Sequence, residues 1–137
     1  MRRVVVTGLG MVSPLANGVD ETWTRLLAGQ SAGGRITRFD ASDLPCQIAC
    51  EIPRGDGTNG TFNAEQWMDA KEIRRYDDFI IYAMAAAKQA MKDSGVEIKT
   101  EDEKYRAGVL IGSGIGGLSN IADTTTLMNE KGPRRIS

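Results

Sequence analysis

Histidine is absent from this chain of 137 residues. Imidazole is the side chain best suited to proton transfer near neutral pH, and it is a common zinc ligand. Its absence excludes a Ser-His-Asp triad, a histidine general base and most zinc sites within this chain. We therefore predict no metal site.

Cysteine is scarce as well. The two thiols, Cys46 and Cys50, are too few for a disulfide framework. On a strand they would share one face but lie roughly 13 Å apart, far beyond the reach of a disulfide. We expect two buried, reduced thiols in a cytoplasmic protein.

The chain has neither an excess of one charge nor a long apolar run. Its 17 lysine and arginine residues balance 18 aspartate and glutamate residues, which does not indicate a general nucleic-acid binder. No run approaches the ~20 apolar residues that span a membrane, and the run after Arg2-Arg3 is too short for a signal peptide. The length and a hydrophobic content of 41% predict one globular domain without nucleic-acid or membrane partners.

Glycine, by contrast, is concentrated between residues 109 and 118. Val109 to Ile111 is a short apolar run that predicts a strand buried on both faces, and residues 118–128 predict a helix. Four glycines lie between these two elements. Because glycine permits positive φ and a close approach of other atoms, we expect a ligand or a partner to pass close to Ile115, the one branched apolar side chain among them.

The remaining patterns alternate between strand and helix. The predicted elements are a buried strand over 2–9, a helix from Asp20 that ends at Gly29, a weaker strand over 47–52, short helices over 63–68 and 71–76, a long helix from Asp77 or Asp78 to Asp93, and a charged connection over 100–105. The sequence is thus of the α/β type. Two or three strands leave apolar surface uncovered, so we expect a fragment of a longer protein.

The long helix carries five alanines, which predict close packing against another backbone. Its spacing of 3.6 residues per turn predicts a buried side. The predicted members of that side are Phe79, Ala83, Ala86, Ala87, Ala90 and Met91.

The pattern Gly112-x-Gly114-x-x-Gly117, between a predicted strand and a predicted helix, also fits an NAD(P)-binding domain of the Rossmann type. That motif normally opens its domain, whereas here more than a hundred residues precede it. The acidic residue expected about 20 residues further on would be Glu130, and no predicted strand precedes it. This alternative would be tested by soaking with a nicotinamide cofactor.

Several blocks of sequence occur in a recognisable order. The chain opens with RRVVVTGLGMVSP at residues 2–14, and the later blocks are Trp23-x-x-Leu26-Leu27-Ala28-Gly29-Gln30-Ser31, Phe39-Asp40, Asp93-Ser94-Gly95, the stretch 111–118 and Gly132-Pro133-Arg134-Arg135-Ile136-Ser137. Together these blocks resemble the β-ketoacyl-acyl carrier protein synthases, and are closest to their type II members. They correspond to roughly the first third of such an enzyme.

The resemblance implies a thiolase-like fold with layers in the order α/β/α/β/α. Residues 1–137 would form the N-terminal part of its N-terminal domain, with no separate second domain. The resemblance also implies a homodimer, no cofactor, and a decarboxylating condensation of an enzyme-bound acyl group with malonyl-acyl carrier protein. The family performs this reaction with a cysteine at a helix N-terminus, two histidines and a lysine.

The cysteines of this chain do not match that nucleophile. The family places it in a Cys-Ser/Thr-x-Gly context, whereas Cys46 is followed by Gln47 and Cys50 by Glu51. The resemblance therefore implies no catalytic residue on this chain, which should be inactive by itself.

Two sets of residues remain as candidate binding residues. On the residues alone, core packing is the simpler interpretation of Ile115. The resemblance instead makes Ile115, with Gly114 beside it, a substrate-binding gate at the end of the acyl pocket. A β-branched side chain on a glycine-flanked backbone can swing and so open or close a narrow apolar tunnel.

The second set is basic. Lys71, Arg74 and Arg75 fall at i, i+3 and i+4 and share a helix face, while Arg134 and Arg135 follow a Gly-Pro turn. Such clusters are ordinarily solvated surface. The resemblance places them where the acidic acyl carrier protein docks, and charge complementarity there would set orientation and association rate. A carrier-binding or dimerisation module that acts by itself is a further alternative, since the same clusters would serve it.

Overall fold

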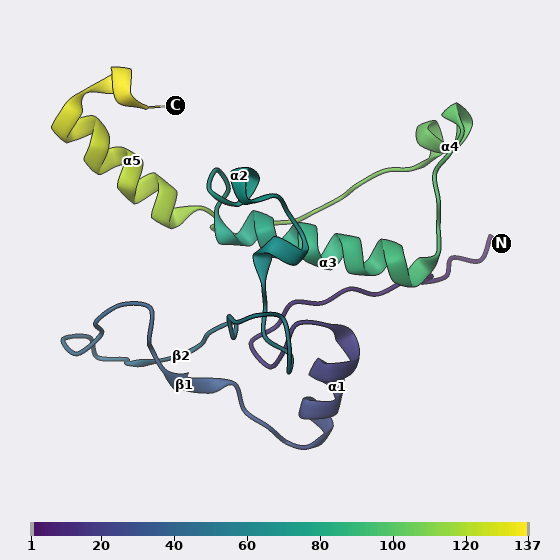
Figure 1. Ribbon diagram of the computed structural model, residues 1–137, viewed down its shortest axis with the longest axis horizontal. Helices are drawn as coiled ribbons and strands as arrows, with labels where there is room; N and C mark the ends of the chain where they lie inside the picture. Colours follow the sequence, from purple (N-terminus) through teal and green to yellow (C-terminus); the bar gives the residue numbers. More distant parts are fainter. Residues whose placement is uncertain (1, 137) are drawn as a thin grey trace.

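The structure, a computed structural model, describes residues 2–136. Its elements are α1 (Val19–Leu27), β1 (Gly33–Arg35), β2 (Ile48–Cys50), the 3-10 helix η1 (Ala64–Gln66), α2 (Ala70–Ile73), α3 (Asp78–Ser94), α4 (Glu101–Arg106), α5 (Leu118–Lys131) and the 3-10 helix η2 (Pro133–Arg135) (Figure 1).

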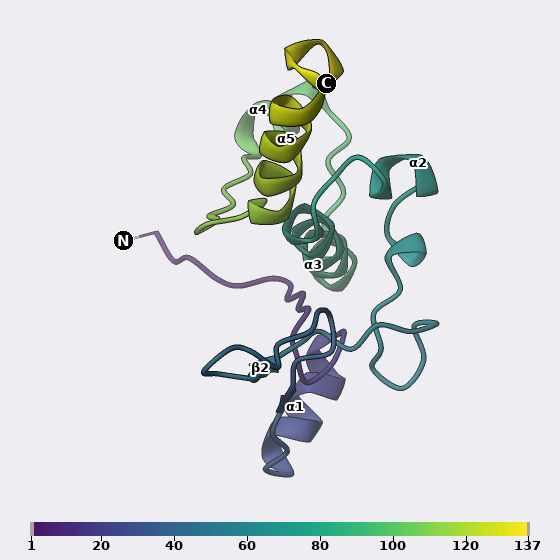
Figure 2. The ribbon, with the colours of Figure 1, turned by 90° about the vertical axis from the view of Figure 1, so that its left-hand side faces the viewer.

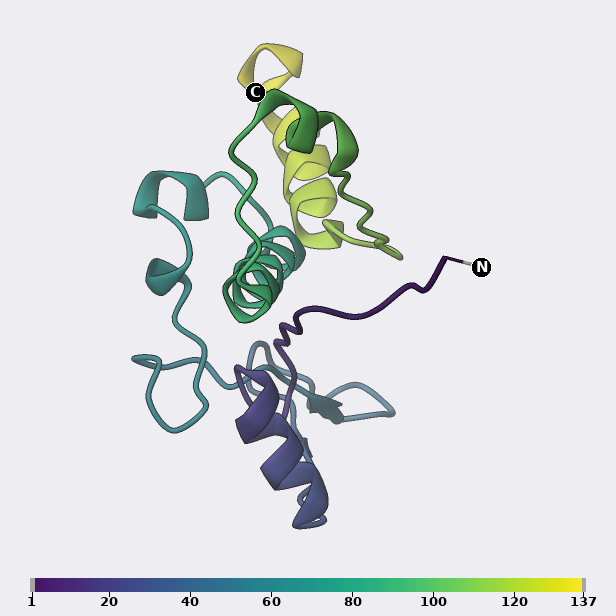
Figure 3. The ribbon, with the colours of Figure 1, turned by 90° about the vertical axis from the view of Figure 1, so that its right-hand side faces the viewer.

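Helix α3 lies at the centre of the arrangement. Viewed almost along its axis, it separates α1 and the β1–β2 hairpin on one side from α4 and α5 on the other (Figures 2 and 3). The sequence of α3 sets both of its ends, since the helix begins at Asp78 and ends before Gly95, which adopts φ 62°. The predicted long helix is therefore confirmed.

The buried side of α3 differs from the prediction. Its two buried residues are Ile81 and Ala85, whereas Phe79 and Met91 are 38% and 47% exposed. The physical reason is that α3 is packed by the loop around residue 62 rather than by a continuous apolar layer. Ile81 and Ala85 form one cluster with Phe62 and Met68. The ring of Phe62 meets that of Tyr82 edge-on, with centroids 5.0 Å apart.

Close packing of α3 against another backbone is confirmed. A Cβ on Gly8 would lie 2.2 Å from the carbonyl oxygen of Ala90, and one on Gly10 would lie 1.9 Å from that of Ala86. The N-terminal segment is thus pressed against the alanines of α3 at positions where only glycine fits.

The predicted strand over residues 2–9 is wrong. Its first residues run as an extended trace away from the other elements, with Val4 93% and Val6 79% exposed, and only its end meets α3 (Figures 2 and 3). No neighbouring strand pairs with it. Where the segment meets α3, its amides donate instead to side chains, Leu9 N–H to Asp93 Oδ2 at 2.8 Å and Met11 N–H to Gln89 Oε1 at 3.0 Å.

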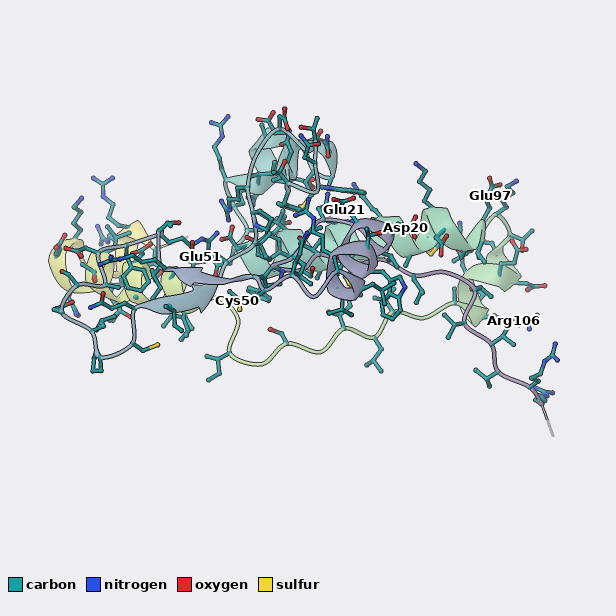
Figure 4. The ribbon with its side chains drawn as sticks, turned by 90° about the horizontal axis from the view of Figure 1, so that it is seen from below. Asp20, Glu21, Cys50, Glu51, Glu97 and Arg106 are labelled. Atoms are coloured by element: carbon teal, nitrogen blue, oxygen red, sulfur yellow. The ribbon has the colours of Figure 1, made fainter. Side chains whose placement is uncertain are left out.

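The described residues contain one sheet, an antiparallel pair in which Gly33 opposes Cys50 and Arg35 opposes Ile48. The weaker strand predicted over 47–52 is confirmed as β2. The strand predicted at 109–111 is wrong, because Val109 and Leu110 are 87% and 99% exposed and no partner strand lies beside them. Before it reaches the glycines that precede α5, the connection from α4 runs clear of the other elements in Figure 4.

Three smaller differences concern local structure. Helix α1 is capped by Gly18 instead of Asp20, which lies in its first turn. The connection predicted over 100–105 is helical, because Thr100 and Glu103 form a reciprocal capping box. Cys46 and Cys50 are free, as predicted, but both are exposed, because β2 belongs to a hairpin that no other layer covers; Figure 4 labels Cys50 there.

Candidate binding site around the glycine turn

The glycine turn, residues 114–117, joins the open connection to α5. Gly117 caps α5 with φ 76°, a left-handed conformation that strains any residue with a Cβ. The predicted helix after the glycines is confirmed as α5. Ile115 is 81% exposed, so its side chain is held by the turn and not by a surrounding core.

Two residues from the start of α3 contact this turn. A Cβ on Gly116 would lie 2.8 Å from Cδ2 and Cε2 of Phe79, and a Cβ on Gly117 would lie 2.7 Å from Oδ2 of Asp77. Nothing lies within 4 Å of the equivalent position on Gly112 or Gly114. The turn is thus anchored at its second half and open at its first.

Ile115 lines a groove of about 450 Å³. The walls come from the start of α3, from the glycine turn and from Arg38 of the loop after β1. Two arginines hold the side chain of Asp78, which lines this groove. Arg38 Nη2 lies 3.0 Å and Arg54 Nη2 lies 2.5 Å from the same oxygen of Asp78, and both donate to the hydroxyl of Tyr82 at 3.3 and 3.1 Å.

Of the two arginines, Arg54 has a shifted pKa. Partial burial lowers the pKa of Arg54, but the hydrogen bonds to Tyr82 and Asp78 outweigh that effect and raise the pKa above its ordinary value. The Ile115 groove is lined by Ile115 and two glycines on the side of the turn, and by Arg38 together with the carboxylates of Asp77 and Asp78 on the other side.

A second groove, of about 730 Å³, shares Gly116 and Gly117 of the same turn with the first. Arg75 and Arg135 both line it, although 60 positions separate them in the sequence numbering, and so do the apolar side chains of Ile80, Ile121 and Leu127. We call it the basic groove. Asp77 and Asp123 also line it, so the arginines share it with two carboxylates.

The structure thus brings some of the predicted site residues together and not others. Arg75 and Arg135 share the basic groove, whereas Lys71, Arg74 and Arg134 are exposed outside its lining. Helix α2 ends at Ile73, with Arg74 as its cap, so the predicted helix over 71–76 is shorter than expected. Gly114 lies at the open end of the turn and lines neither groove.

Sequence reasoning missed Asp77 and Phe79 as site residues. Both line both grooves, together with Gly116 and Gly117. Asp77 was predicted only as a possible helix start and Phe79 only as core. The contacts that reveal their role span some 40 positions of the chain, which no local pattern reports.

Metal and membrane features are limited. Among residues 2–136, no group of three or more histidine, cysteine, aspartate or glutamate side chains could hold a metal ion. Helices long and apolar enough to cross a membrane are likewise missing from the part of the chain that the structure describes.

Comparison with solved structures defines the class. The ishigamide ketosynthase/chain length factor superposes with a TM-score of 0.71 and 32% sequence identity, covering 96% of this chain and 30% of that one. The fold is that of a ketosynthase, as the predicted thiolase-like class requires.

Comparison of sequences gives the family. The model of the β-ketoacyl synthase N-terminal domain matches residues 1–137. The 3-oxoacyl-[acyl-carrier-protein] synthase 2 of Rhizobium meliloti (strain 1021) is 55% identical over 137 residues, which are 100% of this chain and 32% of that protein. The synthase 2 of Coxiella burnetii (strain RSA 493 / Nine Mile phase I) is 48% identical over 136 residues, 99% of this chain and 31% of that protein. This chain belongs to the β-ketoacyl synthase family.

The family assignment argues against the alternative that the glycines bind a dinucleotide cofactor. Gly112-x-Gly114-x-x-Gly117 is part of the region matched by the family model, and no strand precedes it, since residues 109–111 are unpaired. The chain spans about a third of the length of these curated relatives.

Proposed function

We propose that this chain is the N-terminal part of a 3-oxoacyl-[acyl-carrier-protein] synthase that elongates fatty acids in the cytoplasm as a homodimer. The observation that carries the proposal is the 55% identity to a synthase 2 over the whole chain. In the reaction, a cysteine outside residues 1–137 accepts the acyl group as a thioester. Malonyl-acyl carrier protein loses CO₂, and the resulting carbanion attacks the thioester carbonyl and releases the thiolate.

The direct test uses the synthase that carries these residues. Acyl-carrier and malonyl-carrier are mixed with it, and 3-oxoacyl-carrier is detected by mass spectrometry together with released CO₂. We expect both products from the synthase and neither from residues 1–137 alone. A purified natural protein of 14.8 kDa that binds carrier without forming product would instead favour the non-catalytic module.

For the substrate, we propose that Ile115, with Gly114 beside it, forms the gate of the acyl pocket. Its exposure of 81% on a turn flanked by glycines supports this role, because a side chain held only by its backbone can swing. Ile115→Phe should reduce the turnover of long acyl-carriers and spare short ones. Equal turnover of long and short chains by this variant would contradict the gate.

For the carrier protein, we propose docking at the basic groove and at the exposed cations around it. Arg75 and Arg135 supply charge inside the groove, and Lys71, Arg74 and Arg134 supply it nearby. Such contacts mainly steer association and weaken with salt.

Reversing Arg74 and Arg75 to glutamate tests this docking surface. The change should raise KM for acyl-carrier and leave KM for a small acyl thioester unchanged, because only the carrier brings acidic surface to the groove. The increase should diminish at high salt. An equal loss with both substrates would remove the docking role.

A further inference from the structure

The two grooves share one wall. It consists of Asp77 and Phe79 at the start of α3 and of Gly116 and Gly117 in the glycine turn, and each of these four residues lines both grooves. The proposed docking groove and the proposed gate thus share a single contact.

The contact is steric at Gly116. Ser113 Oγ lies 2.6 Å from the ideal Cβ position, and two carbons of the Phe79 ring lie 2.8 Å from it, so a Cβ there would meet both side chains. Real Cβ atoms do not approach carbon so closely, so ring and glycine fit each other only as they are. At Gly114, two residues before, the same space is open.

The contact is also electrostatic at Gly117. Asp77 is the N-cap of α3, yet its side chain makes no capping hydrogen bond there. Its Oδ2 lies 2.7 Å from the ideal Cβ position of Gly117, which is the N-cap of the 14-residue helix α5 and has no side chain of its own. A carboxylate beside a helix N-terminus is stabilised by the helix dipole.

We propose that Phe79 and Asp77 are positioning residues for Ile115. Phe79 blocks one direction of movement of the turn and Asp77 attracts the start of α5, so the two together fix the backbone from which Ile115 projects. The inference rests on the proposed gate function of Ile115 and extends it to two residues of another helix. It makes acyl-length selectivity depend on the start of α3.

The test measures the ratio of kcat/KM for a long and a short acyl-carrier in the complete synthase. Phe79→Ala should bring this ratio about fivefold closer to unity. The reason is that Ile115 on a loosened turn discriminates less between long and short acyl chains. Asp77→Asn keeps the shape, removes the charge and should have a smaller effect in the same direction. Gly34→Ala is the matched control, since nothing lies within 4 Å of the Cβ position there.

A double variant makes the test independent of folding losses. Gly116→Ala drives a methyl group into the Phe79 ring and should change the ratio strongly. Adding Phe79→Leu relieves the contact with the ring while that with Ser113 Oγ remains, so the pair should recover part of the selectivity that Gly116→Ala loses. A merely structural role of Phe79 would lower kcat/KM for both chain lengths alike and leave the ratio where it was.

The failures are distinguishable. If Ile115→Phe leaves the ratio unchanged, the gate itself is wrong. If Ile115→Phe changes the ratio while Phe79→Ala, Phe79→Leu and Gly116→Ala do not, the gate stands and the positioning role of α3 is overturned.

Discussion

The cluster around Phe62 and the open connection over residues 107–113 both contain large apolar side chains, but those of the cluster are buried and those of the connection are exposed. Phe62, Met68 and Ile81 are between 4% and 8% exposed, while Val109 and Leu110 are 87% and 99% exposed. The difference is that the first group meets a partner within the chain, α3 against its own preceding loop, and the second does not. An apolar run therefore indicates that a segment is suited to burial. It does not indicate that the residues that would cover it belong to this chain.

The largest expected effect is in the buried cluster. Ile81→Ala should lower the free energy of unfolding by about 2–5 kcal/mol, because it removes apolar contacts and leaves a cavity beside Phe62 and Ala85. Urea denaturation of the synthase measures it. A loss below about 1 kcal/mol would show that this cluster is not a real core.

Leu110→Ala sharpens the comparison by giving different results in two settings. In residues 1–137 alone, the change should cost almost nothing, since Leu110 is 99% exposed. In the complete synthase proposed above we expect further chain to cover this segment, so the change should cost about 2 kcal/mol or more there. Similar small losses in both settings would refute the idea that this run is covered.

Gly10→Ala should have a smaller but distinct effect, of about 1–3 kcal/mol. The new Cβ would lie 1.9 Å from the backbone oxygen of Ala86, so either α3 or the N-terminal segment must move. Thermal unfolding compares it with Gly34→Ala, where a Cβ meets nothing. Equal Tm values for the two variants would contradict the close approach.

The smallest effect concerns pH and an exposed contact. The hydroxyl of Thr37 donates to Glu51 Oε2 at 2.6 Å and its amide to Oε1 at 3.1 Å, and these bonds lower the pKa of Glu51. A lowered pKa means stability that is complete above the pKa of the unfolded chain and lost as pH falls through that of the folded chain. Glu51→Gln should flatten this acid-side dependence, measured by unfolding between pH 6 and about pH 3. An unchanged slope would show that the contact contributes nothing.

Much of the local structure could be predicted because its causes are local. Gly95 ends α3, and Asn63 accepts a hydrogen bond from the amide of Glu65 to start η1, as their residue types indicate. β2 likewise lies within the strand predicted over 47–52. The capping box of Thr100 and Glu103 is equally local, and the Thr-x-x-Glu pattern that indicates it is present in the sequence.

The errors arise where structure depends on distant residues. Residues 2–9 have the composition of a strand, but a strand forms only beside another strand, and these residues meet a helix instead. The candidate site shows the same limit. Ile115 stands out among its glycines, whereas Phe79 acquires its place in the wall only through a contact with Gly116.

The crossing of the N-terminal segment over α3 has a consequence for biosynthesis. The amide of Leu9 is bonded to a side chain 84 positions later. At ribosomal rates of roughly 5–20 residues per second, the opening residues wait several seconds before their docking site emerges. During that interval the amides of Leu9 and Met11 lack their side-chain partners on α3, so the docking of this segment is a late step that follows synthesis of the whole helix.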